Sequence, residues 1–513
     1  MNQKVLPAAC GLLLLLYPLG ADDWLSYGHD PQRTGWSPRE TDINRENAGS
    51  MSLLWKTHLD NQPRELNSLT EAVVSEWVIT DKGMKEIAVV GGAADNLFAL
   101  EASTGKLLWK KTFAAEGKPR QEPHWLCPNS LNATPLIRKD DLGVSVYAIS
   151  SDGKLHVLNI KNGEDMKPPL QFVPPFSKNW SLNLADDVLY TTTSQGCNNA
   201  RSGVYALDLT VPDAKPKFFQ AARDGAGIWG RAGVAISEGG MLFAGTGDGS
   251  YDPNKGELPD TILQLSAKDL RLVDYFTPVN HNYLTRKDLD MGSLSATVFP
   301  LNGREVVAAG GKEGVVYLLN AKGIGGGDHK TPLYRSPVFV NEQADFAGSG
   351  FWGAFATMED DKQTRWLFAP ALGPAASGVK FPLTNGDAPN GSIMAFRIEE
   401  KDGKPTVAPA WISRDMNLPE PPIVAGDLVL AISNGEFARQ SKDSGGLYSS
   451  AERIAKHVGN TVLYAFDART GKQLFSSGDT MLSWTHFSGI SISGGRVYVT
   501  TFDSTVYGFG VKQ

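Results

Sequence analysis

The sequence predicts an all-β protein, an eight-bladed β-propeller of four-stranded antiparallel blades that an N-terminal strand closes. Three observations predict this fold. A short segment with the character of a strand and a turn recurs along the chain, glycine and proline are frequent (54 and 30 of 513 residues), and continuous helical periodicity is missing from most of the chain. Many short strands separated by turns are typical of barrels, sandwiches and propellers.

The recurring segment starts with an alternating apolar and polar run and ends in a turn, as in NLFALEASTGKLLW (96–109). Its β-branched and aromatic residues favour strands, and the glycine of the turn reaches positive φ at little cost. Eight segments share this pattern, and the other seven begin at residues 154, 203, 261, 315, 392, 461 and 504.

Each copy follows a second pair of short strands, such as GVAISEGGMLFAGTGDG before residue 261. One repeat is therefore four antiparallel strands. A single sheet of this size leaves both of its faces exposed to solvent, whereas radial stacking of the copies buries them. The last copy, 504–511, has no fourth strand after it, and SLLWKTHL (52–59) is an outer strand without a blade of its own. We expect residues 52–59 to complete the final blade, which removes the exposed sheet edges.

Two insertions interrupt the repeat. Residues 373–390 form a Gly-, Pro- and Ala-rich loop in blade six, and residues 441–460 split blade seven. In the second insertion, SSAERIAKHVGN predicts a short helix with Ser449 or Ser450 as its N-cap and Gly459 as its C-terminal stop. Long insertions on one rim are usual places for binding. The alternative is decoration of the fold without a function.

The first 21 residues differ from the rest of the chain. In MNQKVLPAACGLLLLLYPLGA one lysine precedes an apolar run, and small residues precede two aspartates. This is the order of a secretory signal peptide. The apolar run is shorter than the roughly 20 residues of a membrane span, which favours cleavage over an uncleaved anchor. We therefore expect a protein that is exported to the periplasm or secreted, has no membrane span after signal cleavage, and forms one domain over residues 22–513.

Two cysteines, Cys127 and Cys197, remain after residues 1–21 are removed. A disulfide is chemically permitted in an exported protein, and two separate buried thiols are the alternative. Neither cysteine belongs to a C-x-x-C-H motif, so the chain encodes no covalent c-type haem. The net charge of −7 comes from 49 basic and 56 acidic residues that are well mixed. No basic stripe is visible, which argues against nucleic acid as a partner.

The A-x-x-T-G-K-x-L-W pattern, the count of eight and the opening DWLSYGHDPQRTGWSP together resemble the pyrroloquinoline quinone (PQQ) repeat of the quinoprotein alcohol dehydrogenase-like propellers. The resemblance covers nearly the whole chain after residue 21. It implies a ring of eight blades built by a tryptophan-docking repeat. Many members hold PQQ and Ca²⁺ near the axis and oxidise alcohols. Others, such as the outer-membrane β-barrel assembly scaffold, carry no cofactor, so the repeat specifies the fold more strongly than the chemistry.

The resemblance implies roles for four residues of blades four and five. Trp229, in GIWGRAGVAI, stands where the family has its floor tryptophan, and Asp248 follows G-T-G where the family has a metal-binding Asn. Asp290, in LDMGSLSATVF, matches the base that takes the hydroxyl proton and also contacts the metal. Lys312, in AAGGKEGVVYLLN, matches the basic residue at the reducing edge of the quinone. An aspartate is a suitable ligand for a hard cation.

One position departs from the family pattern. The metal-binding Glu before the third-blade strand aligns with Cys197 in TSQGCNNARSGVYALD, and cysteine is a poor Ca²⁺ ligand. Gln195 or Asn198 offers a carbonyl oxygen there, with less charge. The carboxylates of the quinone also need basic partners, and Arg231 and Arg201 are candidates by position.

Each of the four matched residues also has a purely structural interpretation. These are packing between blades for Trp229, a turn for Asp248, a strand-end cap for Asp290 and a solvated hairpin for Lys312. Trp352 in GSGFWGAFA and Trp484 in SWTHFSGI echo Trp229, which favours packing for all three. His486, beside Trp484, is expected to be a satisfied rim histidine rather than a ligand.

Two functions therefore compete. The first is a periplasmic quinoprotein-like dehydrogenase that oxidises an alcohol-type substrate with PQQ and a divalent cation at the propeller axis. It would pass electrons to an external acceptor such as a cytochrome c. The second is a non-catalytic propeller that acts as a binding or assembly scaffold. The pair of Asp290 and Lys312 favours the first, and Cys197 at the ligand position favours the second; the balance leans to the first.

Overall fold

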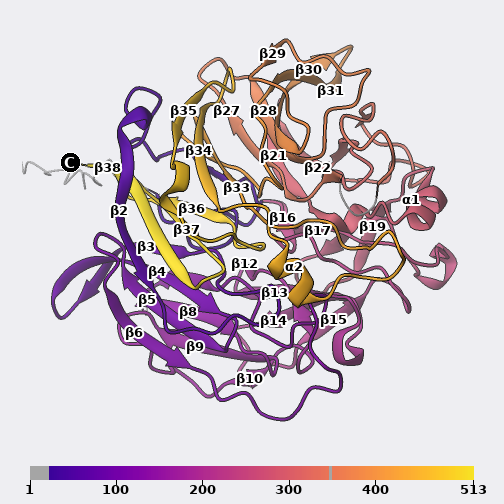
Figure 1. The fold of residues 1–513 in the computed structure, drawn as a ribbon. Coiled ribbons are helices and arrows are strands. Elements are labelled where there is room, and N and C mark those ends of the chain that lie inside the picture. Colours follow the sequence, from indigo (N-terminus) through magenta and orange to yellow (C-terminus); the bar gives the residue numbers. More distant parts are fainter. Residues whose placement is uncertain (1–21, 142, 346–348, 513) are drawn as a thin grey trace, which may run out of the picture.

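The computed structural model describes residues 22–141, 143–345 and 349–512; the expected signal peptide, 1–21, lies outside them. The described chain is nearly all β, and its eight four-stranded antiparallel blades form a propeller (Figure 1). The predicted fold class is confirmed. None of the helices found in the described residues is long and apolar enough to cross a membrane.

Consecutive blades use consecutive stretches of the chain, and the strands of the first four blades are as follows. Blade one has β3 (Val73–Thr80), β4 (Gly83–Gly92), β5 (Asn96–Glu101) and β6 (Leu107–Thr112). Blade two has β7 (Leu136–Asp140), β8 (Gly143–Ile149), β9 (Lys154–Asn159) and β10 (Leu170–Gln171). Blade three has β11 (Lys178–Asn179) and β12 (Asn183–Ala185), which both pair with β13 (Val188–Ser194), then β14 (Gly203–Asp208) and β15 (Lys217–Gln220). Blade four has β16 (Ala235–Ile236), β17 (Met241–Gly245), β18 (Ile262–Ser266) and β19 (Leu272–Phe276).

The remaining blades carry the insertions and the closure. Blade five has β21 (Thr297–Leu301), β22 (Arg304–Ala309), β23 (Tyr317–Asn320) and β24 (Tyr334–Arg335). Blade six has β25 (Gly350–Phe351), β27 (Ala356–Glu359), β28 (Arg365–Leu372), β30 (Gly391–Lys401), β31 (Lys404–Ile412) and the short β29 (Leu383–Thr384). Blade seven has β32 (Ile423–Ala425), β33 (Leu428–Ser433), β34 (Val462–Asp467) and β35 (Gln473–Ser476), with β1 (Trp36–Ser37) at its inner edge. Blade eight has β36 (Ile490–Ser493), β37 (Arg496–Thr500), β38 (Thr505–Val511) and β2 (Met51–His58). Between blades five and six, β20 (Leu294–Ser295) pairs in parallel with β26 (Gly353–Ala354).

The ring closes as the sequence predicts. Strand β2 pairs antiparallel with β38 and becomes the outer strand of blade eight. Figure 1 shows this contact as the indigo strand beside the yellow one. Apolar residues of blades seven, eight and one share one buried cluster, in which Val90, Leu430 and Val499 are fully buried. The closing blade is therefore packed on both faces like the others.

Tryptophans of the outer strands connect three pairs of neighbouring blades. The indole N–H of Trp55 donates to the Ala102 carbonyl at 2.9 Å, that of Trp109 to Ile160 at 2.7 Å and that of Trp411 to Ala468 at 2.8 Å. Each indole lies over a turn glycine with positive φ, and these glycines are Gly105, Gly163 and Gly471. A Cβ on Gly471 would stand 2.4 Å from the Trp411 ring. The turn therefore needs glycine both for its φ and for the indole.

The insertion in blade seven contains the predicted helix, α2 (Ser450–Ala455). Ser449 is its N-cap and forms a capping box with Glu452, as expected for this pattern. The predicted stop at Gly459 is wrong, because the helix ends at Ala455. Beyond the helix, the backbone N–H groups of Val458 and Gly459 both donate to the carbonyl of Gly435, which precedes the insertion. This tertiary contact draws the chain out of the helix early. A second helix, α1 (His281–Lys287), precedes blade five.

Loss of an inter-blade tryptophan should destabilise the ring. Trp411 is fully buried, so Trp411→Ala should cost about 3–5 kcal/mol of the free energy of unfolding through lost burial and an empty cavity. Trp77→Ala is the matched control, because Trp77 is 53% exposed and its loss should change stability by no more than about 0.5 kcal/mol. Urea unfolding followed by circular dichroism measures both. Equal effects of the two substitutions would contradict the role of the docked indole.

Candidate functional site

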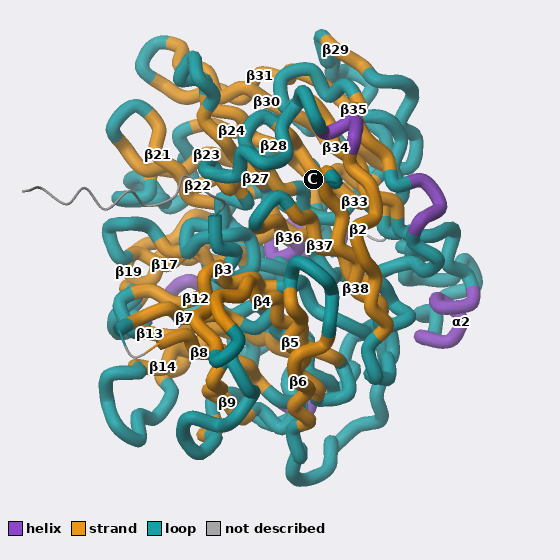
Figure 2. The backbone as a smooth tube through the Cα atoms, turned by 90° about the vertical axis from the view of Figure 1, so that its left-hand side faces the viewer, coloured by secondary structure: helices purple, strands orange, loops and turns teal. Residues whose placement is uncertain are grey.

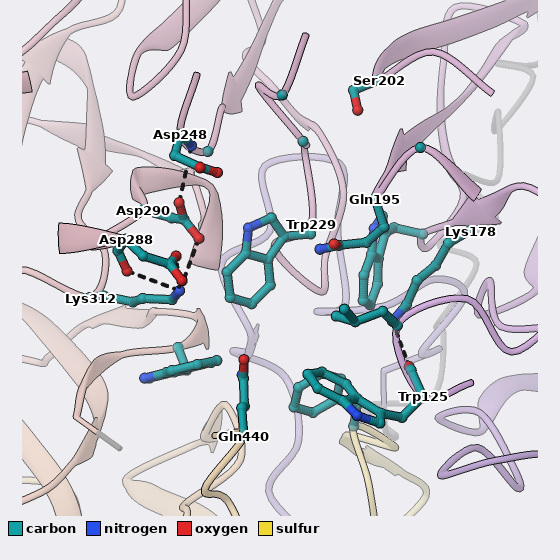
Figure 3. Close-up of a pocket in the computed structure, with 18 of the residues that line it drawn as sticks. Trp125, Lys178, Gln195, Ser202, Trp229, Asp248, Asp288, Asp290, Lys312 and Gln440 are labelled. Atoms are coloured by element: carbon teal, nitrogen blue, oxygen red, sulfur yellow. Dashed lines mark hydrogen bonds and ion pairs between the residues drawn. The ribbon is translucent and has the colours of Figure 1, made fainter. Parts of the chain in front are cut away.

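One cavity of about 600 Å³ is lined by all four of the side chains that the sequence singled out in blades four and five, Trp229, Asp248, Asp290 and Lys312. Figure 3 shows Asp248, Asp290 and Lys312 on one side of the Trp229 indole, and Lys178 and Trp125 on the other. The structure therefore brings together residues that are up to 83 positions apart in the chain. The expected convergence of these four residues is observed.

Antiparallel pairing explains why these residues meet at one rim. Asp248 follows the end of β17, and Trp229 precedes the start of β16. In blade five Lys312 follows the end of β22, and Asp290 precedes the start of β21. Because the start of a first strand and the end of a second lie at the same edge of an antiparallel pair, all four residues are delivered to the same end of their blades.

Lys312 holds two carboxylates together at this end of the cavity. Its Nζ lies 2.7 Å from Oδ1 of Asp288 and 3.0 Å from Oδ2 of Asp290. The side chain of Lys312 is only 3% exposed, so the solvated hairpin that was the alternative is wrong. Burial by itself lowers the pKa of Lys312, but the charges of Asp290 and Asp288 outweigh it and raise the pKa above its usual value. The ammonium is thus fixed as a cation.

Asp290 is bonded through both of its oxygens. Oδ2 faces Lys312, and Oδ1 accepts the backbone N–H of Asp248 at 3.0 Å. Burial raises the pKa of the Asp248 carboxyl, and the charge of Asp290 raises it further. Burial and, after it, the negative charge of Asp290 raise the pKa of Asp288 to about 6. Asp248, Asp288 and Asp290 thus form an acidic cluster. The single Lys312 ammonium balances only part of its negative charge.

A further carboxyl group lies behind this cluster and was not predicted. Asp260 has no exposed surface; its Oδ2 accepts the Thr285 hydroxyl at 2.6 Å, and its Oδ1 accepts the Met291 N–H at 3.4 Å. Burial and the charge of Asp290 raise the pKa of Asp260 to about 8. At neutral pH Asp260 is therefore protonated and supports the turn that carries Asp290.

The tryptophans of the cavity combine packing with an accessible face. Trp229 and Trp352 meet edge to face with their ring centroids 5.4 Å apart. The Lys312 ammonium lies 5.3 Å from the Trp229 centroid and 5.4 Å from the Trp352 centroid. Trp229 is partly exposed in the cavity. Trp484 instead stacks on Phe502 in a separate cluster, so it is a packing residue.

The two arginine candidates are placed differently. Arg231 is buried, pairs with Glu420 at 3.5 Å and lies over the Phe487 ring; it is not among the residues that line the cavity. Arg201 does line the cavity, and its Nη1 donates to Oε1 of Gln220 at 3.0 Å. Their assignment to cofactor carboxylates stays a prediction.

Cys127 and Cys197 form a disulfide, with their Cα atoms 5.4 Å apart. The neighbouring residues Leu126 and Gly196 line the cavity, so the bridge borders it. Cys197 thus offers no thiolate to a metal. Asn198 is also committed elsewhere, because its side-chain NH2 donates to Asn129 and Phe176 and its Oδ1 accepts the Arg120 N–H.

The donor set was compared with what Ca²⁺ requires, six to eight oxygen ligands. Among the described residues, no group of three or more His, Cys, Asp or Glu side chains is arranged to hold a metal ion. Both oxygens of Asp290 already have partners, and Gln195 and Asn199 line the cavity near the altered position. As they stand, these groups do not form a calcium site, and Ca²⁺ at Asp248 and Asp290 stays a prediction.

The opposite end of the cavity is cationic and aromatic. Its lining residues are Trp125, Trp180, Lys178, Arg453, Glu436 and His486. His486 Nδ1 lies 2.7 Å from Glu436, so the predicted satisfied histidine is confirmed. Burial lowers the pKa of His486 to about 4, and the imidazole is therefore neutral. Apart from His486, none of these residues was predicted from the sequence.

Comparisons with known proteins agree with the fold. The family described as outer membrane protein assembly factor BamB matches residues 43–211, less than half of the chain. No curated protein matches the chain in sequence. Among solved structures, quinohemoprotein alcohol dehydrogenase from Comamonas testosteroni has 14% identity and a TM-score of 0.59, covering 95% of this chain and 80% of its own. A europium-containing methanol dehydrogenase has 12% identity and a TM-score of 0.59, covering 96% and 98%. The resemblance to PQQ-repeat, quinoprotein alcohol dehydrogenase-like propellers is thereby confirmed at the level of the fold.

The protonation of Asp260 predicts a pH dependence of stability. Its pKa is raised in the folded state, so its favourable contribution is full below about pH 4, the usual aspartate pKa, and is lost as the pH rises through about 8. Asp260→Asn cannot ionise. The free energy of unfolding of the wild type, relative to that of this variant, should therefore fall between pH 4 and pH 8.

Urea unfolding of both proteins at pH 5, 6, 7 and 8 measures this difference. Asp387→Asn, at an exposed position, is the control and should run parallel to the wild type. Parallel curves for wild type and Asp260→Asn would show that Asp260 is ionised throughout.

Proposed function

We propose that the chain is a quinoprotein-like dehydrogenase that oxidises an alcohol-type substrate in this cavity, with PQQ as the electron-accepting group. The observation that carries the proposal is the arrangement of Asp290, with its carboxylate at the cavity wall between the Lys312 ammonium and the Asp248 N–H. A cation beside a carboxylate, next to an indole face, is what the oxidation of an alcohol by a flat quinone needs.

The residues present fit a flat, anionic ring compound. The partly exposed Trp229 offers an apolar surface for a ring, and several cationic side chains line the cavity, namely Lys178, Arg201, Arg223, Lys312 and Arg453. Trp229 and Arg201 would hold the ring and a carboxylate, and Lys312 would lie at the reducing edge. When bound, PQQ would accept the hydride, with its two electrons, that leaves the alcohol carbon.

The chain's own groups would supply the proton transfer. Oδ2 or Oδ1 of Asp290 would accept the hydroxyl proton of the substrate while the carbon–hydrogen bond breaks toward the quinone. Lys312 would keep Asp290 in place and add positive charge beside the developing negative charge. Asp288 shares the ammonium of Lys312 and thereby balances its charge. The electrons would then pass to an external acceptor such as a cytochrome c.

Export of the chain is part of the proposal. A disulfide between Cys127 and Cys197 is stable in oxidising compartments and rare in the cytosol. Together with the signal-like residues 1–21, it supports a periplasmic or secreted protein.

A second candidate is a non-catalytic propeller that acts as a binding scaffold. The observation in its favour is that the Lys312 ammonium already bridges Asp288 and Asp290. Cys197, at the position of the family's metal ligand, is bonded to Cys127 and offers no ligand to a cation. In this case Trp229 and Trp352 would serve packing and ligand contact only.

Titration of the purified protein with PQQ, with and without Ca²⁺, separates the two candidates. We expect uptake at micromolar concentration, seen as a shift of the quinone absorbance, and reduction of an artificial dye when short alcohols are added. Asp290→Asn should take up the quinone but lose at least about 100-fold in turnover, because its amide cannot accept the proton.

The control for this experiment is Asp269→Asn, at an exposed position in the hairpin of β18 and β19; it should keep wild-type turnover. Circular dichroism should show that all three proteins are folded. Absence of quinone uptake by the folded wild type would exclude the dehydrogenase and leave the scaffold.

A further inference from the structure

Lys178 is a buried cation with no carboxylate at ion-pair distance among the described residues. It begins β11 in blade three, is 6% exposed and lines the cavity. Its Nζ donates one long hydrogen bond, 3.4 Å, to the Trp125 carbonyl, and Figure 3 shows the ammonium beside Trp125 at the cavity wall. Among the described residues Lys178 takes part in no ion pair. A buried ammonium in such surroundings is costly unless a partner compensates it.

The other charges at this end compensate one another. Arg453 lies 2.5 Å from Oε1 of Glu436, and the other oxygen of Glu436 faces neutral His486. Arg231 pairs with Glu420. Lys178 is thus the one charge left over in this group of residues. In agreement with this, burial and then the charges of Arg231 and Arg453 lower the pKa of Lys178 to about 7, and the negative charge of Glu436 opposes them only in part.

The walls around Lys178 are aromatic and their polar groups are already bonded. The Trp125 N–H donates to the Tyr448 carbonyl of the insertion in blade seven at 2.8 Å, and the Trp180 N–H donates to the Ser194 hydroxyl at 2.9 Å. The ammonium lies 5.2 Å from the Trp180 centroid. A ligand here would meet indole surface and a single free cation. This combination suits a planar or apolar group that carries one negative charge.

We propose that Lys178 is an anion-binding residue and that this end of the cavity receives a carboxylate attached to an aromatic or apolar body. A monoanion fits better than a phosphate, because only one charge is uncompensated. The carboxylate has two possible sources, a quinone such as PQQ or a separate carboxylate-bearing substrate. The binding step rests on Lys178 and the aromatic walls and does not require the dehydrogenase function.

The test uses benzoate, benzyl alcohol and PQQ as probes, measured by isothermal titration calorimetry on the full-length mature protein. Benzyl alcohol is the neutral partner of benzoate with the same ring. Wild type should bind benzoate more tightly than benzyl alcohol. Lys178→Met should lose at least tenfold in affinity for benzoate and keep its affinity for benzyl alcohol. Lys161→Met, which removes an exposed lysine, should behave as wild type.

The PQQ arm distinguishes the sources. If the carboxylate belongs to the quinone, Lys178→Met also lowers PQQ affinity at least tenfold, and benzoate competes with PQQ. If it belongs to a substrate, PQQ affinity is unchanged and benzoate binds to the loaded protein. Failure of PQQ to bind, with Lys178-dependent binding of benzoate, contradicts the dehydrogenase but supports the anion site.

A second measurement needs no ligand. Removal of an uncompensated buried charge should stabilise the empty protein, so Lys178→Met should raise its melting temperature, whereas a structural lysine would lower it. Lys178→Gln keeps a polar end of similar length and serves if the Met variant does not fold. Unchanged affinity for both benzoate and PQQ in these variants would overturn the proposal.

Discussion

At three junctions of the ring, including the one that closes it, neighbouring blades are joined by an indole of one blade that lies over the turn glycine of the next. Trp411, for example, packs on Gly471 and donates to Ala468. A four-stranded sheet has two apolar faces and no layer of its own to cover them. The docked tryptophan fixes how the next sheet lies against the first, and the same contact recurs at Trp55, where the N-terminal strand completes blade eight. The closure of the ring and two further blade junctions therefore use the same interaction.

The stacking of the blades determines which segments of the chain line the cavity. Figure 2, a view from the side, shows α2 at one edge of the molecule. The insertion that carries α2 reaches the cavity through Arg453, whose guanidinium lies 4.5 Å from the Trp125 centroid. Blades three to six contribute further walls, and so do the segments before blades two and eight, which carry Trp125 and His486. The cavity is thus lined partly by residues at fixed positions of the repeat and partly by residues of an insertion. The sequence allows the first kind to be predicted more readily than the second.

The repeat positions could be predicted because they stand at fixed places relative to strands. Asp248 and Lys312 follow second strands, so recognising the strand pattern also located the side chains. Asp288 could have been found in the same way, since it is two residues before Asp290. Asp260 and Lys178 could not, because burial and distant partners give them their properties, and KNWSLNL around Lys178 reads as an ordinary strand. The early end of α2 depends likewise on a contact with Gly435, which no local pattern shows.

The lysines at the two ends of the cavity differ in whether a carboxylate balances their charge. This difference determines which chemistry each end can perform. Lys312 has two carboxylates within 3.0 Å, so its charge is balanced within the protein. Any cation that enters must therefore compete with it for Asp290. Lys178 has no such carboxylate in the part of the chain that the structure describes, so an anion that enters completes an ion pair without breaking one. Binding energy is therefore available at the Lys178 end, while the Asp290 end retains groups suited to moving a proton. A ligand anchored by its negative group at Lys178 would present its opposite end toward the acidic cluster, where Asp290 carries the carboxylate.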